Sequence, residues 1–151
     1  MKRYPQLIGL SDEHHTALVL ARRVARTADG RGKLSVPQAW QQIETAFAEE
    51  LEPHFLVEEK FMVPPLEKFS EVEVTQALAR LRDEHRLLRE WVRDTHKHDT
   101  ENLARFGQAL HDHVRFEERV LFALAEEKLS TVELDRIAQA CPKRNRSGLK
   151  T

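Results

Sequence analysis

Apolar residues recur at steps of three and four along four long stretches of this chain, the spacing that gathers them on one face of an α-helix. The stripe of the second stretch is Trp40, Ile43, Phe47, Leu51 and then Phe61 or Met62. The stripe of the fourth is Leu103, Phe106, Leu110, Val120 or Leu121, and Leu124. Four amphipathic helices joined by short polar loops most readily pack as an antiparallel bundle.

Capping residues and turn residues set the expected helix ends. Ser35, Ser70 and Ser130 each precede a Gln or Glu by three positions, which is the pattern of a capping box. The expected helices run from Ser11 to about Asp29, Ser35 to about Met62 before Pro64-Pro65, Ser70 to about His96, Asp99 or Thr100 to about Lys128, and Ser130 to Pro142. The predicted fold is therefore all-α, an antiparallel up-down-up-down four-helix bundle with a short fifth C-terminal helix across one end.

Length and charge favour a single domain without a polyanionic partner. The 151 residues suffice for one core, which we expect to occupy residues 1–142, followed by a basic, flexible tail at 143–151. A net charge of -1 gives no global field for nucleic acid or membrane surfaces, and no apolar run approaches the roughly 20 residues of a membrane span. We expect no nucleic-acid or membrane partner and a cytoplasmic location. Cys141 is the only cysteine, so we interpret it as incidental.

Polar residues interrupt the apolar stripes at matching places. The second helix carries His54 and Glu58 between Leu51 and Phe61, and the fourth carries His113 and Glu117 between Leu110 and Val120. Both are His-x-x-x-Glu pairs. Residues four apart lie one turn apart on the same helix face. His85 continues the apolar row of the third helix, and His14 continues that of the first.

The neighbouring residues favour His14 over His15. Asp12-Glu13-His14 is matched by Asp83-Glu84-His85, which indicates an internal repeat of a single-histidine helix followed by a His-x-x-x-Glu helix. His15 shares a more polar face with arginines. We expect the other histidines to face solvent, and these are His15, His96, His98 and His111.

Two interpretations fit the buried histidines and glutamates. Each buried carboxylate could pair with a protonated imidazole on its own helix, but this leaves His14 and His85 as unexplained polar groups on apolar rows. A metal site explains all of them, because imidazole nitrogens and carboxylates are ligands for iron, zinc, manganese or copper. Six ligands exceed the four of tetrahedral zinc, and six around one octahedral ion would leave no place for a reactant. We therefore favour two ions, each with two histidines and both carboxylates.

With these residues in this order, the chain resembles the hemerythrin-like proteins of the HHE cation-binding domain family. The matching segments are Asp12-Glu13-His14-His15, Pro53-His54-Phe55-Leu56-Val57-Glu58-Glu59, Asp83-Glu84-His85, and His113-Val114-Arg115-Phe116-Glu117-Glu118 with Val120-Leu121-Phe122. The resemblance implies a four-helix bundle with a non-haem di-iron centre, oxo- or hydroxo-bridged, with zinc or manganese as alternatives. The metal ligands it implies are His14, His54, Glu58, His85, His113 and Glu117.

The chain departs from oxygen-carrying hemerythrins at two positions. Such proteins have a fifth histidine four residues after the third-helix ligand, where this chain has Arg89, and an aspartate five residues after the fourth-helix histidine. Here Glu117 stands at four and Glu118 at five, so the choice between them stays open. The set is closer to HHE proteins associated with iron sensing and nitric-oxide response.

These observations lead to a main functional hypothesis with two competitors. We expect a di-iron protein that binds or senses dioxygen or nitric oxide. The alternatives are an enzyme that reduces peroxide or nitric oxide or repairs iron centres, and an interaction module that responds to iron. No protein nucleophile is assigned, since the metals would carry the chemistry.

Three further expectations concern the surroundings of the site. Pro53 removes a helix hydrogen bond and should kink the second helix just before His54. We interpret the phenylalanines mostly as ordinary core, with some lining a dry cavity, and these are Phe47, Phe55, Phe61, Phe106, Phe116 and Phe122. We interpret Glu13, Glu59, Glu84 and Glu118 mostly as solvated surface, with acceptance of imidazole N–H groups as the alternative.

Overall fold

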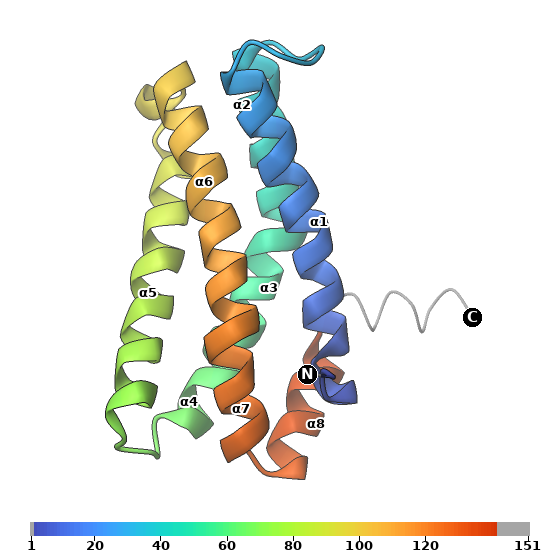
Figure 1. Cartoon of the computed structure of the whole chain (residues 1–151), viewed down its shortest axis with the longest axis vertical. Coiled ribbons are helices and arrows are strands. Elements are labelled where there is room, and N and C mark those ends of the chain that lie inside the picture. The colour runs from blue at the N-terminus through green and yellow to red at the C-terminus, as the bar shows by residue number, and fades with distance from the viewer. Residues whose placement is uncertain (1, 142–151) are drawn as a thin grey trace, which may run out of the picture.

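Four long helical stretches lie side by side in the computed structural model, which describes residues 2–141 (Figure 1). The first is α1 (Pro5–Ala28) and the third is α5 (Val72–Arg93). The second comprises α2 (Val36–Ala46), η1 (Phe47–Leu51), α3 (Glu52–Val57), η2 (Glu58–Met62) and α4 (Val63–Leu66). The fourth comprises α6 (Thr100–Phe116), η4 (Glu117–Leu121) and α7 (Phe122–Lys128). With α8 (Thr131–Ala140) packed against α1 and η2 at one end of the bundle and no strand in the described residues, the predicted all-α bundle is confirmed.

Three of the predicted helix starts are confirmed. Ser35 and Ser130 each form a complete capping box, with Gln38 and Glu133 respectively. Asp99 caps α6 by accepting a hydrogen bond from the backbone N–H of Asn102. These side chains satisfy backbone donors that have no partner within the first turn of a helix.

Two predicted starts are wrong. The first helix begins at Pro5, because a proline fits the first turn of a helix, where its missing N–H is not needed. Ser11 therefore lies inside α1, and its hydroxyl donates to Glu118 Oε2 at 2.8 Å. In α5 the residue before the helix is Glu71, which makes no side-chain cap, so Ser70 does not cap it.

The ends of the second and third helices also differ from expectation. Pro64 and Pro65 do not stop the second helix at Met62, because they occupy the first turn of α4 directly after a π-helical turn. The third helix ends at Arg93, and a short 3-10 helix, η3 (Thr95–Lys97), follows it. The predicted end of the fifth helix at Pro142 and the predicted tail at 143–151 lie outside the described residues.

The three π-helical turns each insert one residue into a helix and change which side chains face inward. η2 buries Met62 and leaves Phe61 37% exposed, and η4 buries Leu121 and leaves Val120 41% exposed. The sequence left both choices open, and the extra residue decides them. Pro53 lies in the first turn of α3, which follows η1, so the irregularity it predicts takes the form of a π-helical turn just before this proline.

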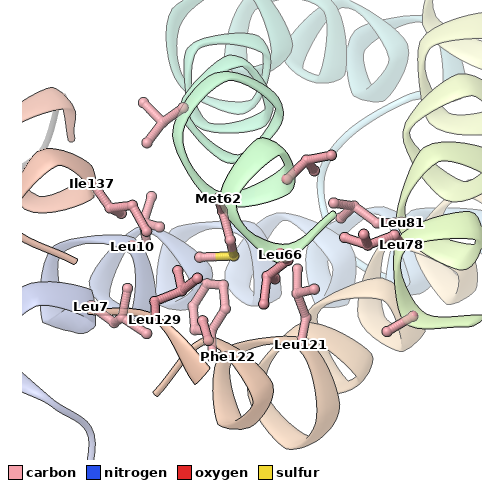
Figure 2. Packing of buried hydrophobic residues seen from close by; sticks show 14 of the residues in the cluster. Leu7, Leu10, Met62, Leu66, Leu78, Leu81, Leu121, Phe122, Leu129 and Ile137 are labelled. Atoms are coloured by element: carbon pink, nitrogen blue, oxygen red, sulfur yellow. The ribbon is translucent and has the colours of Figure 1, made fainter. Parts of the chain in front are cut away.

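Two apolar clusters fill the bundle, one on each side of a polar layer. The first, at the α8 end, packs Met62, Leu66 and Phe122 against Leu7 and Leu10 of α1, with Ile137 of α8 beside them (Figure 2). The second is built around residues of α2, α6 and the later part of α1, which include Trp40, Ile43, Leu20, Val24 and Phe106. Every long helical stretch passes from one cluster to the other.

Gly107 lets α1 and α6 approach closely. A Cβ at this position would lie 3.0 Å from Cγ2 of Val24 and 3.1 Å from the backbone oxygen of Ala21. The contact holds two of the helices that carry the polar layer at short range. Within the described residues, no helix has the length and apolar character needed to traverse a bilayer.

Candidate metal centre

The polar layer between the two clusters contains all six predicted ligands. Each long helical stretch contributes to it where its residues pass from one cluster to the other. The six residues are at most 4% exposed, and they are His14 from α1, His54 from α3, Glu58 from η2, His85 from α5, His113 from α6 and Glu117 from η4. We call these six residues the inner set.

The inner set divides into two groups that share both glutamates. One group is His14, His54, Glu58 and Glu117, and the other is His85, His113, Glu58 and Glu117. In each group the ligand atoms lie within 4.8 Å of one another. Each group therefore contains two histidines and both glutamates.

Each carboxylate presents one oxygen to each histidine pair. Oε2 of Glu58 lies 2.9 Å from Nε2 of His54, and its Oε1 lies 3.1 Å from Nε2 of His85. Oε1 of Glu117 lies 2.7 Å from Nε2 of His14, and its Oε2 lies 3.0 Å from Nε2 of His113. Each glutamate therefore faces both histidine pairs.

Several inner atoms are buried without a hydrogen bond of acceptable geometry. Among the described residues these are both oxygens of Glu58, Oε2 of Glu117, Nε2 of His85 and Nε2 of His113. Leaving a buried carboxylate unsatisfied costs several kcal/mol. A cation held by either group would give partners to the unsatisfied atoms of that group, so the residues fit a metal.

Glutamates outside the inner set orient the histidines of the first half of the chain. Nδ1 of His14 lies 2.5 Å from Oε2 of Glu118, and Nδ1 of His54 lies 2.9 Å from Oε1 of Glu13. An ionised carboxylate only accepts hydrogen bonds, so each Nδ1 is the donor. The neutral imidazole then presents the lone pair of Nε2 to the inner set.

The same contact recurs in the second half. Nδ1 of His85 lies 2.7 Å from Oε2 of Glu59, and Nδ1 of His113 lies 2.7 Å from Oε1 of Glu84. We call the four glutamates the outer ring, and they are Glu13, Glu59, Glu84 and Glu118. Interpreting most of them as solvated surface is wrong, since each contacts a histidine of a neighbouring helix. The available signal is that each directly adjoins a predicted ligand in the sequence.

Arginines contact three members of the outer ring. Nη1 of Arg89 lies 2.8 Å from Oε2 of Glu59, and Nε of Arg80 lies 2.7 Å from Oε2 of Glu84. Arg3 reaches Oε1 of Glu118 at 3.5 Å. Arg89 is the residue at the position of the fifth hemerythrin histidine, and it supports the site through a carboxylate.

Aromatic rings stack against two of the histidines. Phe55 stacks on His85 with ring centroids 3.8 Å apart and 11° between the planes. Phe122 stacks on His14 at 5.1 Å. The core interpretation fits these two buried rings, whereas Phe61 lies at the surface. The guanidinium of Arg89 lies over the ring of Phe55, 5.5 Å from its centroid, so Phe55 contacts both this arginine and His85.

Without a metal, the inner histidines are strong bases. Burial alone would lower the pKa of His85, but the carboxylates of Glu117, Glu58 and Glu59 raise it to about 10. Burial is likewise outweighed at His113, where Glu117 contributes most to raising the pKa to about 9. A metal that binds here must displace protons from these rings.

The remaining histidines and the cysteine differ in exposure to solvent. His15 and His96 are exposed and His111 is partly exposed, in agreement with the expectation that they face solvent. The expectation for His98 is wrong, because its ring stacks on Trp40 at 4.1 Å and its Nε2 donates to the backbone oxygen of Trp91. Cys141 is buried, and its thiol lies 3.8 Å from Oε1 of Glu13, so it is packed against the outer ring.

A comparison with protein-family models agrees with this geometry. The model described as the hemerythrin HHE cation-binding domain matches residues 9–126, a range that contains the whole inner set and outer ring. No curated protein and no solved structure matches the chain.

Proposed function

The chain belongs to the hemerythrin HHE cation-binding domain family, and on that premise we propose that it is a non-haem di-iron protein that binds or senses dioxygen or nitric oxide. The single observation that carries the proposal is the placement of Glu58 and Glu117, each with one oxygen toward each histidine pair. One shared carboxylate could belong to a single ion. Two, each facing both pairs, favour a pair of ions.

The proposal of iron rests on the family and on the donor set. Imidazole and carboxylate ligands suit iron, and they also accept zinc or manganese. A bound pair of iron ions would supply redox-active positions for a diatomic ligand. The inner set as resolved has six members, because Arg89 stands where oxygen carriers have a further histidine. Fewer protein ligands leave more positions for an exogenous ligand.

A small cavity beside the inner set supports a diatomic ligand. It measures about 10 Å³, which is close to the space of one water-sized sphere. Its walls include His14, His54 and His113 together with apolar side chains, among them Ala17, Leu51, Leu110 and Val114. Such walls exclude larger polar substrates and limit access by bulk water.

The proposal is tested by loading the protein with Fe²⁺ without oxygen and then adding each gas separately. We expect about two irons per chain, a coupled pair in Mössbauer spectra, and new optical bands with dioxygen or nitric oxide. His54→Ala and Glu117→Ala should abolish these bands, whereas His15→Ala should not. Loading without a spectral response to either gas would leave a cation-binding protein and remove the proposed ligand.

A further inference from the structure

A surface groove runs between α1 and α2, which lie next to each other in Figure 1. The groove measures about 600 Å³, and its charged and polar lining consists of Thr16, Arg23, Gln38, Gln41, Gln42, Thr45, Glu49 and Glu50. All of these side chains except Arg23 offer oxygen atoms, which are the groups that replace water around a divalent cation. The two carboxylates come from η1, the π-helical turn that leads toward His54.

Glu50 separates this groove from the cavity beside the inner set. It is the residue that the lining of the groove and the lining of the cavity have in common. On the cavity side, Glu50 faces the same space as His14, His54 and His113. Nε2 of His113 is one of the buried atoms without a hydrogen bond among the described residues. A movement of one side chain would therefore join the groove to a site that needs a cation.

The surroundings leave the carboxylate of Glu50 available for this role. Glu50 is partly buried, and among the residues that the structure describes its side chain makes no hydrogen bond or ion pair. A partly buried carboxylate attracts a cation more strongly than one in bulk water, because the local dielectric is lower. Glu49, its neighbour, lines the groove but not the cavity, and it is exposed.

We propose that Glu50 admits metal cations from the groove to the inner set. The carboxylate first binds the incoming divalent ion at the wall and then passes it to the histidines and glutamates behind. This inference rests on metal binding by the inner set, as proposed above. Because Glu50 is not a member of the inner set, its contribution is to the rate of metal entry and not to the final number of bound ions.

The test is a stopped-flow measurement of Co²⁺ uptake by the full metal-free chain, followed through the visible bands of the bound ion. Glu50→Gln keeps the shape of the wall and removes its charge, so uptake should be about tenfold slower with the same final stoichiometry. Glu49→Gln is the matched control, since it removes the same charge from the same groove. Its uptake rate should stay within about twofold of that of the unmodified protein.

A second variant tests the wall itself. Glu50→Ala shortens the side chain that closes the cavity, so loss of bound Co²⁺ to excess chelator should be faster than in the unmodified protein. Unchanged uptake by Glu50→Gln would overturn the proposal. Equal slowing in Glu49→Gln would also overturn it, by assigning the effect to the charge of the groove. Fewer ions bound by Glu50→Gln would make Glu50 a ligand instead. If the unmodified chain took up no Co²⁺ at all, metal binding itself would fail, which is a distinct result.

Discussion

The glutamates of the inner set and those of the outer ring carry the same carboxylate group in opposite surroundings. The inner carboxylates of Glu58 and Glu117 are 0% exposed, and three of their four oxygens have no hydrogen bond of acceptable geometry in the described residues. The outer carboxylates each accept a hydrogen bond from an imidazole, and three of them also contact an arginine. The comparison separates two roles, since the inner oxygens lack partners that a cation would supply, and the outer oxygens already hold the histidines in place.

Adjacent glutamates show this division most clearly. Glu58 and Glu59 are neighbours in the sequence, as are Glu117 and Glu118, and in each doublet the first faces inward and the second contacts a histidine of another helix. Residue type therefore does not determine the role. The helix position and the group that meets each side chain determine it.

Removing an inner glutamate should have the largest effect on metal content. Glu117 belongs to both metal groups, so Glu117→Ala should abolish tight binding of both ions, while His85→Ala should retain about half of the metal. Elemental analysis after anaerobic loading, with circular dichroism as a check of folding, measures this. Equal losses in the two variants would mean that the glutamate is not shared.

Removing an outer glutamate should weaken metal binding without changing the number of ions. Glu59→Gln loses the charge that holds Nδ1 of His85, and such changes typically lower affinity by roughly 10- to 100-fold. Competition with a chelator of known affinity measures the change, and Glu90→Gln, on the exposed face of α5, is the control. An affinity equal to that of the control would show that the outer ring does not orient the ligands.

The stability of the metal-free protein should fall as pH rises. The pKa values of His85 and His113 are raised from 6.5 to about 10 and about 9 in the folded state. A raised pKa stabilises the fold fully below the unfolded value, and this contribution is lost as pH rises through the folded value. The melting temperature should drop by several degrees between about pH 6.5 and about pH 10, measured by circular dichroism. The metal-loaded protein should not show this drop, and a parallel loss in both forms would point to groups elsewhere.

Substituting Arg89 should have the smallest effect, because it acts through Glu59. Arg89→Gln should lower metal affinity by a few-fold, about 0.5–1 kcal/mol, since a partly exposed ion pair contributes little. Arg86→Gln, on the same helix and more exposed, provides the matched comparison in the same chelator competition. A loss as large as that of Glu59→Gln would place Arg89 in direct control of the site.

The bundle and the convergence of the six candidates followed from periodicity. Polar residues at matching places in apolar stripes must face one another once the helices pack, and the choice of His14 over His15 agrees with burial. That these side chains bind metal stays a prediction. The repeated Asp-Glu-His sequence on the first and third helices was informative because it indicates which histidine of the first helix lies on the same face as His85 does on the third.

The π-helical turns and the outer ring could not be predicted in the same way. A periodic stripe of apolar residues does not reveal an inserted residue. The insertions were visible only as two ambiguous stripe positions, Phe61 or Met62 and Val120 or Leu121. The contacts of Glu13 and Glu118 depend on which helix lies beside which. Likewise, nothing local to His98 indicates that Trp40, far away in the sequence, covers its ring.

The outer ring also runs in a fixed direction around the bundle. The glutamate of each helical stretch holds the histidine of the next, from Glu13 to His54, Glu59 to His85 and Glu84 to His113, and Glu118 closes the circuit at His14. Each stretch thus donates one of these hydrogen bonds through its histidine and accepts another through its glutamate. A shift of any single helix along its axis would disrupt both of its glutamate–histidine contacts at once. The capacity to bind a cation therefore depends on the correct packing of all four helices together.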